Sequence, residues 1–295
     1  MSLDALLHRR EPTAFELFTQ DPLRFLARKA YELTSKQPDL VTSSANGVPV
    51  RIVCISDTHS QHAKLGTLPD GDILIHAGDL THSGTPEEVR DALQWLASQP
   101  HPHKIFIAGN HDHALSDDET RATLLDAFPA LVYLQQSSTT IAVRERTFRI
   151  YGSPLTPAHG SWAFQYPRAS PAQAEWDSIP SDTDVLVTHG PPMHHVDRGS
   201  GCAALLSAVW KVRPRLHICG HIHAARGVEA LSWTGAQAAY ERILARTGGW
   251  WDLLVVFFGG VFTRTSARES TVLVNAASLG GFRDEQVRGA IVVDL

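Results

Sequence analysis

Short apolar runs, each leading into a turn-forming or polar residue, dominate the chain from residue 50 onward. They are rich in Val, Ile and Leu, and they lead into Asp57, Gly78, Gly109, Gly152, His189, Gly220 and Ser278. Runs this short, with apolar side chains on both faces, predict buried strands rather than helices. Helical patterns lie between several of them, at residues 86–98, 119–128 and 202–212. This alternation predicts an α/β fold with polar residues at the strand ends.

Composition narrows the possible function classes. With 295 residues and 43% hydrophobic content, the chain can form one large domain or two small ones. The net charge of −5 gives no overall basic field, so there is no strong nucleic-acid signal. The three cysteines (Cys54, Cys202 and Cys219) are too few for a disulfide framework, and the N-terminus lacks an apolar signal segment. We expect a cytoplasmic location, with a nuclear one left open.

The chain is expected to have a main domain at residues 49–295. Residues 1–48 are predicted to be an N-terminal helical extension and linker, because residues 22–36 have apolar side chains near helical spacing. Within the main domain, an insertion at about 227–268 interrupts the alternation of strands and helices.

The insertion contains a helical pattern at residues 235–246 and the apolar run WWDLLVVFFGGVF at residues 250–262. This run is interrupted by Asp252 and is too short to span a bilayer. A buried hairpin or core helix is the first interpretation. The alternative is an exposed patch that makes a weak membrane or partner contact.

Five of the predicted strand ends carry side chains that can bind metal ions. They are Asp57 and His59, Asp79, the run Asn110-His111-Asp112, His189, and the pair His221 and His223. Side chains two residues apart in an extended segment project to the same side, so Asp57 and His59 can reach one ion. Because ligands bind at the carboxyl ends of strands in such sheets, we expect the whole set to meet there. Carboxylate, amide and imidazole groups suit hard to borderline divalent cations.

Each of these residues also has an ordinary structural explanation when it is taken alone. An Asp after a strand is more often a turn or a helix cap. A His inside an apolar run, such as His76, is more often a hydrogen-bonded core residue, and His82 and His159 are expected in surface loops. The conjunction of five strand ends in chain order nevertheless favours a metal site over chance.

The ordered motifs resemble those of the calcineurin-like metallophosphoesterase superfamily. Its pattern of D-x-H, G-D, G-N-H-[DE], a His before Gly, and G-H-x-H occurs here without a gap. The segments GSPLTP, THGPP, CGHIH and VNAAS look like the small metallophosphoesterase-domain subgroup related to class III cyclic nucleotide phosphodiesterases, with fungal-type relatives nearest. The resemblance covers about Val50 to Leu295 and implies a four-layer α/β/β/α sandwich.

The resemblance also implies a role for each strand-end residue. Asp79 would bridge two divalent ions, one held by Asp57, His59 and His223 and the other by Asn110, His189 and His221. His111 would face the scissile phosphate as a catalytic residue, and Asp112 would orient it. Subgroup membership favours Mn²⁺, while the mixed nitrogen and oxygen ligands leave Fe and Zn²⁺ open.

The implied function is hydrolysis of a phosphate ester by a hydroxide that bridges the two ions. We expect phosphodiesters of small, nucleotide-like substrates. A phosphomonoesterase or protein phosphatase is the enzymatic alternative, and a non-catalytic metal-stabilised scaffold is the other. No G-x-S-x-G or G-x-x-x-x-G-K-[ST] motif points to a covalent or phosphate-loop mechanism. Trp162, Phe164 and Tyr166 are candidates for stacking on a nucleobase, and His194 for the entrance of the site.

Overall fold

The computed structural model describes residues 12–34, 48–168, 172–262, 270–281 and 284–295. These residues fall into two compact units. The helical unit draws on Met1–Lys36 and Ser232–Ser266, and the sheet unit on Gln37–Leu231 and Ala267–Leu295. All the predicted site residues belong to the sheet unit.

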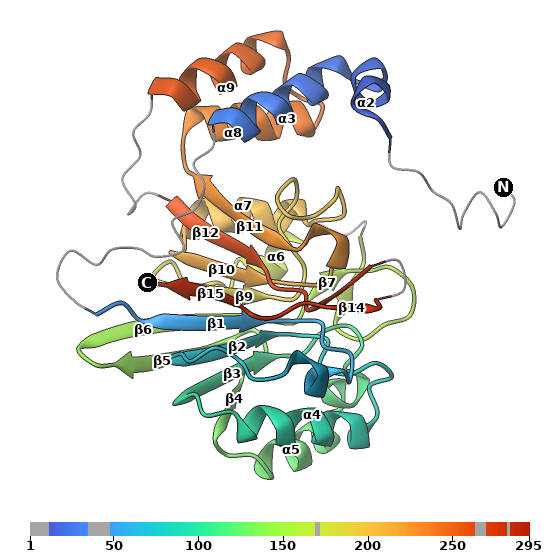
Figure 1. The fold of residues 1–295 in the computed structure, drawn as a ribbon, viewed down its shortest axis with the longest axis vertical. Helices are drawn as coiled ribbons and strands as arrows, with labels where there is room; N and C mark the ends of the chain where they lie inside the picture. The colour runs from blue at the N-terminus through green and yellow to red at the C-terminus, as the bar shows by residue number, and fades with distance from the viewer. Residues whose placement is uncertain (1–11, 35–47, 169–171, 263–269, 282–283) are drawn as a thin grey trace, which may run out of the picture. The chain divides into compact units, whose positions relative to one another are not determined.

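One sheet of the sheet unit contains five strands in the order β15-β1-β2-β3-β4 (Figure 1). They are β1 (Arg51–Ile55), β2 (Ile73–Ala77), β3 (His103–Ile107), β4 (Leu131–Tyr133) and β15 (Ile291–Asp294). Strands β1 to β4 run parallel, and β15 is antiparallel to β1. The residues that follow β1, β2 and β3 therefore lie at the same edge of this sheet.

The other sheet contains six strands in the order β11-β12-β10-β9-β6-β5. They are β5 (Ser137–Val143), β6 (Arg146–Ser153), β9 (Val185–Thr188), β10 (Leu216–Cys219), β11 (Gly227–Ser232) and β12 (Ser270–Asn275). Strands β6, β9, β10 and β12 run parallel, whereas β5 and β6 are antiparallel. The main chain at the ends of β9 and β10 is joined by a hydrogen bond from the Gly220 N–H to the His189 carbonyl.

All seven predicted strands are confirmed, as β1, β2, β3, β6, β9, β10 and β12. Within these two sheets, the strands that the sequence did not predict are β4, β5, β11 and β15, which are the four edge strands. An edge strand is partly solvated, so it does not need a continuous apolar run. Strand β5 illustrates this, since its buried and exposed side chains are mixed.

Alternate side chains of each strand pack on opposite faces of its sheet. Ile52 of β1 and Ile218 of β10 belong to the apolar core between the two sheets. Val53, the next residue along β1, belongs instead to a cluster with Val89 and Leu93. The two clusters together cover both faces of β1, β2 and β3, whose doubly apolar runs the sequence predicted.

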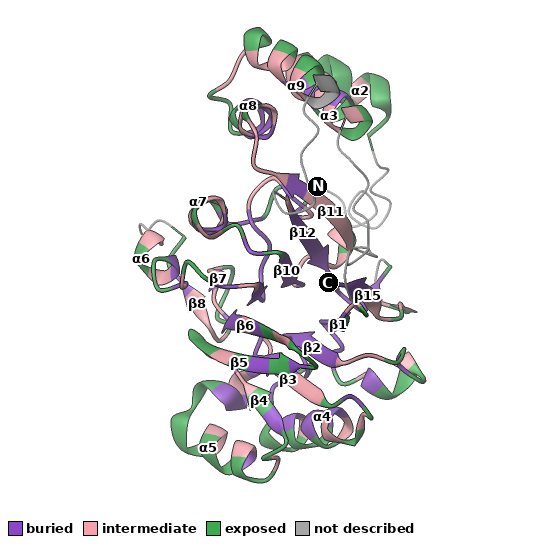
Figure 2. Ribbon diagram, turned by 90° about the vertical axis from the view of Figure 1, so that its left-hand side faces the viewer, coloured by how far each residue is buried: buried purple, intermediate pink, exposed green. Residues whose placement is uncertain are grey.

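Helices cover the outer faces of the two sheets (Figure 2). Helices α4 (Pro86–Ser98) and α5 (Asp118–Asp126) lie on the first sheet, and α6 (Gln173–Trp176) and α7 (Ala203–Val212) on the second. The helices predicted at 86–98, 119–128 and 202–212 are confirmed as α4, α5 and α7. The sheet unit is the predicted four-layer α/β/β/α sandwich.

Short elements surround the ends of the central strands. Strand β7 (Thr156–Pro157) pairs with β8 (Gln165–Tyr166), and β13 (Leu279–Gly280) pairs with β14 (Gln286–Val287). Single 3₁₀ turns occur at His62–Leu65, His113–Ser116 and His223–Ala225.

The helical unit contains α2 (Ala14–Gln20), α3 (Pro22–Thr34), α8 (Gly235–Leu244) and α9 (Trp250–Phe262). Ala27 and Ala30 of α3 share an apolar cluster with Ile243 of α8 and Val256 of α9. The sequence predicted helices near α3 and α8, and both are confirmed. The N-terminal extension and the insertion were predicted as separate segments. The structure instead packs helices from both segments into one core, and no local pattern encodes such a long-range contact.

Helix α9 presents an apolar stripe to solvent. Its exposed side chains are Trp250, Trp251, Leu254, Phe257 and Phe258, which recur at helical spacing. The apolar run is therefore a helix rather than a buried hairpin. Its exposed apolar side chains form the surface patch that the sequence left as the alternative. No helix in the described part of the chain has the length and apolarity needed to cross a membrane. A weak membrane or partner contact through residues 250–262 stays a prediction.

Candidate metal centre

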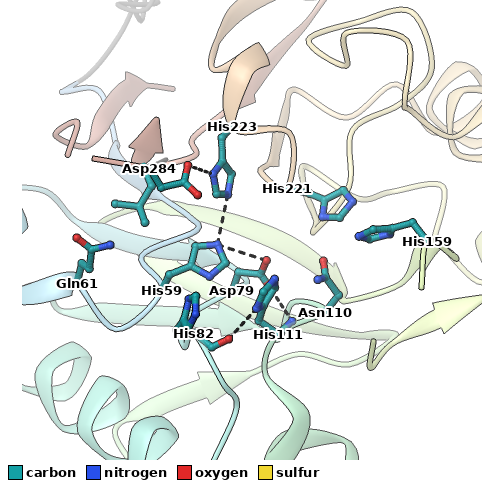
Figure 3. A pocket seen from close by; sticks show the side chains of 11 residues that line it. His59, Gln61, Asp79, His82, Asn110, His111, His159, His221, His223 and Asp284 are labelled. Carbon is teal, nitrogen blue, oxygen red and sulfur yellow. Dashed lines mark hydrogen bonds and ion pairs between the residues drawn. The ribbon is translucent and has the colours of Figure 1, made fainter. Parts of the chain in front are cut away.

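The seven predicted metal ligands come together where the carboxyl ends of the central strands of both sheets meet. They follow β1, β2 and β3 in one sheet and β9 and β10 in the other. Above them lies a pocket of about 300 Å³. Figure 3 labels the ligands that line this pocket, which are His59, Asp79, Asn110, His221 and His223. Residues from 57 to 223 are thus gathered at one place by the pairing of parallel strands within each sheet and by the packing of the two sheets.

Asp57, His59 and His223 form the first group of donor atoms. These atoms all lie within 4.8 Å of one another. His223 Nε2 is 3.3 Å from Asp57 Oδ1, and the same nitrogen is 3.3 Å from His59 Nε2. Two imidazole nitrogens and a carboxylate oxygen directed at one point are the ligand types of a divalent cation.

Asp79, His189 and His221 form the second group, again with donor atoms within 4.8 Å of one another. His189 Nε2 is 3.3 Å from Asp79 Oδ2 and 3.1 Å from Asn110 Oδ1. Asp79 Oδ2 is also 3.7 Å from His59 Nε2 in the first group. The Asp79 carboxylate therefore lies between the two groups, where a bridging ligand is needed.

The Nδ1 contacts of two imidazoles indicate that the donor groups fit metal ions. His59 Nδ1 lies 3.2 Å from the Thr81 carbonyl oxygen, and His189 Nδ1 lies 2.9 Å from the Ala77 carbonyl oxygen. A carbonyl can only accept a hydrogen bond, so each Nδ1 carries a proton, and a ring without a second proton directs its Nε2 lone pair at the group. Histidines that bind metals are held in this way. The donor set accordingly fits two divalent cations.

The backbone at four of these ligands is left-handed. The φ angles are 53° at Asp57, 41° at His59, 54° at Asp79 and 66° at His221. Non-glycine residues rarely adopt this region, and where they do at functional sites the cost is about 1–3 kcal/mol each. The surrounding sheets must supply this energy, which is a reason to find such turns at a binding site.

Two glycines let the ligand loops approach closely. A Cβ atom on Gly109 would overlap the Asp79 carboxylate and main chain, and one on Gly220 would overlap Asp57 Oδ2. These glycines directly precede Asn110 and His221 in the motifs. The Gly of each motif is thus needed because a ligand from another strand occupies the space of its side chain.

The charges of the site favour a cation. Burial alone would raise the pKa of Asp57, but the hydrogen bond with His223 and the nearby imidazoles lower it below its usual value. Burial would lower the pKa of His189, but the Asp79 carboxylate and other polar neighbours raise it to about 9. The carboxylates therefore stabilise positive charge at this place, whether it is a proton or a metal cation.

His111 lies beside the first group. Its Nδ1 is 2.7 Å from the His82 carbonyl oxygen, and its backbone N–H donates to Asp79 Oδ1 at 2.8 Å. Its ring meets that of His59 edge to face, with centroids 4.7 Å apart. One donor atom of His111 is within 4.8 Å of donor atoms of His59 and Asp79, so the ring faces the metal groups.

The expected role of Asp112 is corrected by the structure. Its fully buried carboxylate accepts hydrogen bonds from the backbone N–H groups of Gly109, Leu80 and Thr81 and from the Thr81 hydroxyl. It does not orient the His111 ring, whose Nδ1 is already paired with a main-chain carbonyl. Burial and the Asp79 charge raise the pKa of Asp112 to about 6. Asp112 therefore ties together the loops after β2 and β3.

Of the predicted substrate contacts, only Trp162 lies beside the catalytic candidates, where its ring stacks on that of His111. Phe164 packs against the apolar cluster that includes α4 and α5. Tyr166 is buried, and its hydroxyl donates to Cys202 Sγ. His194 has its backbone N–H bonded to Asp197 and is not among the described residues that line the pocket.

Several pocket residues were not predicted to belong to the site. Gln61, His82, His159, Leu279 and Asp284 line it together with the ligands. His82 lies three residues after Asp79, and His159 lies in the GSPLTPAHG segment, so proximity in sequence could have indicated both. Asp284 carried no such signal, because it lies between β13 and β14 and reaches His223 only in the folded protein.

The fold and the strand-end ligands define a metallophosphoesterase-type protein. The family model of calcineurin-like phosphoesterases matches residues 50–225, and the chain belongs to this family. The match includes every predicted metal ligand and His111.

Relatives cover different shares of the chain. It is 43% identical over 307 residues to the probable rhamnogalacturonate lyase C of Emericella nidulans, covering 99% of this chain and 29% of that protein. It is 41% identical over 209 residues to metallophosphoesterase domain-containing protein 1 of Homo sapiens, covering 61% of this chain and 62% of that protein. UPF0046 protein K07C11.7 of Caenorhabditis elegans is 36% identical over 200 residues. The chain thus spans less than two thirds of the first two relatives.

Proposed function

We propose that this phosphoesterase hydrolyses phosphodiesters of small, nucleotide-like substrates with two divalent ions at the strand ends. The charge of the pocket carries this preference. Among the described residues, the pocket lining includes Asp79 and Asp284 but no Lys or Arg. A phosphodiester has one negative charge, whereas a phosphomonoester has about 1.5 to 2 at pH 7. With no Lys or Arg in the described lining to pair with the second charge, the diester is the better electrostatic match.

The size of the pocket supports a small substrate. Its volume of about 300 Å³ lies at the lower end of the range for small-molecule sites. A nucleotide-like ester fits such a space, whereas a phosphorylated protein would need a broad docking surface around it. Protein phosphatase activity is therefore the less favoured alternative.

The ligand groups suggest how the ions would be held. Asp57, His59 and His223 would bind one ion, Asn110, His189 and His221 the other, and Asp79 both. When bound, the ions lower the pKa of the attacking water to about 7 and offset the charge of the phosphate. Mn²⁺ is the cation we propose first, and Fe and Zn²⁺ suit the same mixed nitrogen and oxygen ligands.

His111 is placed to act on the leaving group. Because its Nδ1 proton is donated to the His82 carbonyl, any proton that the ring gives must come from Nε2. A protonated His111 would pass this proton to the leaving oxygen. General acid help of this kind is worth about 10²–10⁴-fold.

Ester hydrolysis, rather than lyase chemistry, is proposed although one relative is named a lyase. This chain covers only 29% of that relative, and the phosphoesterase match at residues 50–225 lies within this chain. We also propose a cytoplasmic location, because Cys54, Cys202 and Cys219 are free and buried.

The test compares bis(p-nitrophenyl) phosphate with p-nitrophenyl phosphate on Mn²⁺-loaded protein. We expect kcat/KM to be higher for the diester, and a higher value for the monoester would support the phosphomonoesterase alternative. Metal content is measured on the same sample. Two bound ions with no turnover of either ester would support the scaffold alternative instead.

A further inference from the structure

We propose that Trp162 is a positioning residue for His111, which holds the imidazole in the orientation that protonates the leaving group. The inference rests on the proposed function, since it requires His111 to act as the acid. The Trp162 indole stacks on the His111 ring with centroids 4.2 Å apart and an angle of 29° between the planes. Trp162 had been predicted from the sequence only as a platform for substrate.

The stacking complements the hydrogen bond of His111 Nδ1. The bond from Nδ1 to the His82 carbonyl, at 2.7 Å, fixes one edge of the ring. A ring held at one edge can still tilt about that bond. An aromatic surface against its face limits the tilt. Together the two contacts define where Nε2 points.

Trp162 is itself tied to the loop that carries His111. The N–H of Ala163 donates to the carbonyl of Asn110 at 3.2 Å, and the N–H of Thr156 donates to the carbonyl of Phe164 at 3.0 Å. The segment between β7 and β8 is therefore fastened to the residue that precedes His111. These main-chain hydrogen bonds therefore keep the Trp162 indole next to the His111 imidazole.

The step that this positioning serves is the departure of the leaving group. Hydroxide derived from water bonds to phosphorus, and the proton of that water goes to solvent. As the bond from phosphorus to the leaving oxygen breaks, His111 gives its Nε2 proton to that oxygen, and it regains a proton from solvent. A stable leaving anion such as p-nitrophenolate needs little of this help, whereas phenolate needs more.

The experiment uses the Mn²⁺-loaded 295-residue chain and methyl aryl phosphodiesters whose leaving groups range from p-nitrophenol to phenol. For Trp162→Ala we expect kcat to fall about 10²-fold with the phenol ester, as for a misplaced catalytic group, and to change little with the p-nitrophenol ester. Trp162→Phe keeps a stacking ring and should restore most of the loss. Ser161→Ala, at the exposed neighbouring residue, is the matched control and should behave as wild type.

A comparison of the double variant with the single variant decides the interpretation. The double variant Trp162→Ala/His111→Ala should be no slower than His111→Ala, because Trp162 acts through His111. Equal loss with all leaving groups, a change in KM alone, or additive losses in the double variant would overturn the proposal. The ratio between two esters does not depend on the folded fraction, so a partly unfolded variant is still informative.

The same data separate this inference from the proposed function. If His111→Ala shows no dependence on the leaving group, then His111 is not the acid and that part of the proposed function fails. If His111→Ala shows the dependence but Trp162→Ala does not, then only the role of Trp162 fails.

Discussion

The two halves of the metal centre have different supports. In the first half, His223 Nδ1 lies 2.7 Å from the Asp284 carboxylate, whose side chain is 43% exposed. In the second half, His189 is fully buried, and its Nδ1 lies 2.9 Å from the main-chain carbonyl of Ala77 in β2. A carbonyl inside a sheet cannot rotate away, whereas a carboxylate in a surface turn can.

The first half is therefore supported by a charged side chain, and the second half by a rigid main-chain carbonyl. The Asp284 carboxylate makes His223 a more basic ligand, and together with Asp57 it raises the pKa of His223 to about 9 against the effect of burial. The Ala77 carbonyl adds no net charge but fixes the His189 ring through the sheet. We expect the second ion to be the more firmly held and the first to depend more on a single exposed side chain.

A buried histidine–threonine pair nevertheless lies behind each half. Behind the first, His76 Nε2 lies 3.0 Å from Thr58 Oγ1, and behind the second, His217 Nε2 lies 2.8 Å from Thr188 Oγ1. Each threonine hydroxyl also donates to a main-chain carbonyl, so each accepts the proton of its histidine. Thr58 and Thr188 each directly precede a predicted ligand, and the buried pairs therefore fix both ligand loops.

The largest effect on metal binding and turnover is expected at Asp79, which lies between the two halves. Asp79→Ala removes the carboxylate that lies between both groups, so bound metal should fall from two ions to one or fewer and diester turnover should fall to background. Metal analysis after gel filtration and kinetic assays measure this. Asp126→Ala, an exposed acid at the end of α5, is the control. Two ions and full turnover in the Asp79 variant would show that this carboxylate does not bridge.

A change confined to the first half should be smaller. Asp284→Asn removes the charge beside His223, and we expect the affinity for the first ion to fall about 10–100-fold while the second is unchanged, as for other residues that orient metal ligands. Calorimetric titration of metal into chelator-treated protein measures both steps. An equal weakening of the two steps would break the distinction drawn between the halves.

The smallest effect is expected in the pH dependence of stability, at His217 of the buried histidine–threonine pairs. Burial lowers the pKa of His217 to about 3, below the value of about 6.5 in an unfolded chain. Between these values the unfolded state binds a proton that the native state does not, so this residue makes stability fall as pH falls from 6.5 towards 3. His217→Gln should remove about 2 kcal/mol of the stability that is lost between pH 7 and pH 5.

Urea unfolding of wild type and His217→Gln at both pH values measures this contribution. Titration of other groups cancels in the difference between the two proteins, provided their environments are unchanged. An identical pH dependence in both would mean that His217 is not held neutral in the folded protein.

Local patterns made much of the sheet unit predictable. The central strands are largely buried and stand out as short apolar runs, and parallel pairing then places the strand ends together. Edge strands such as β5 escaped prediction because solvent relaxes the requirement for apolar residues. The role of Asp112 was misassigned, because neighbours in sequence suggested His111 whereas the fold supplied closer donors from Leu80 and Thr81.

By itself, the sequence determined the central strands, the helices between them and the set of candidate metal ligands, because periodicity and motif order are local properties of the chain. Only the tertiary structure decided that Asp284 supports His223, that Trp162 stacks on His111 and that α3 packs with α8 and α9. These contacts join residues that are far apart in the chain. They form because sheets and helices bury apolar surface together, and no local pattern records which side chains meet when they do.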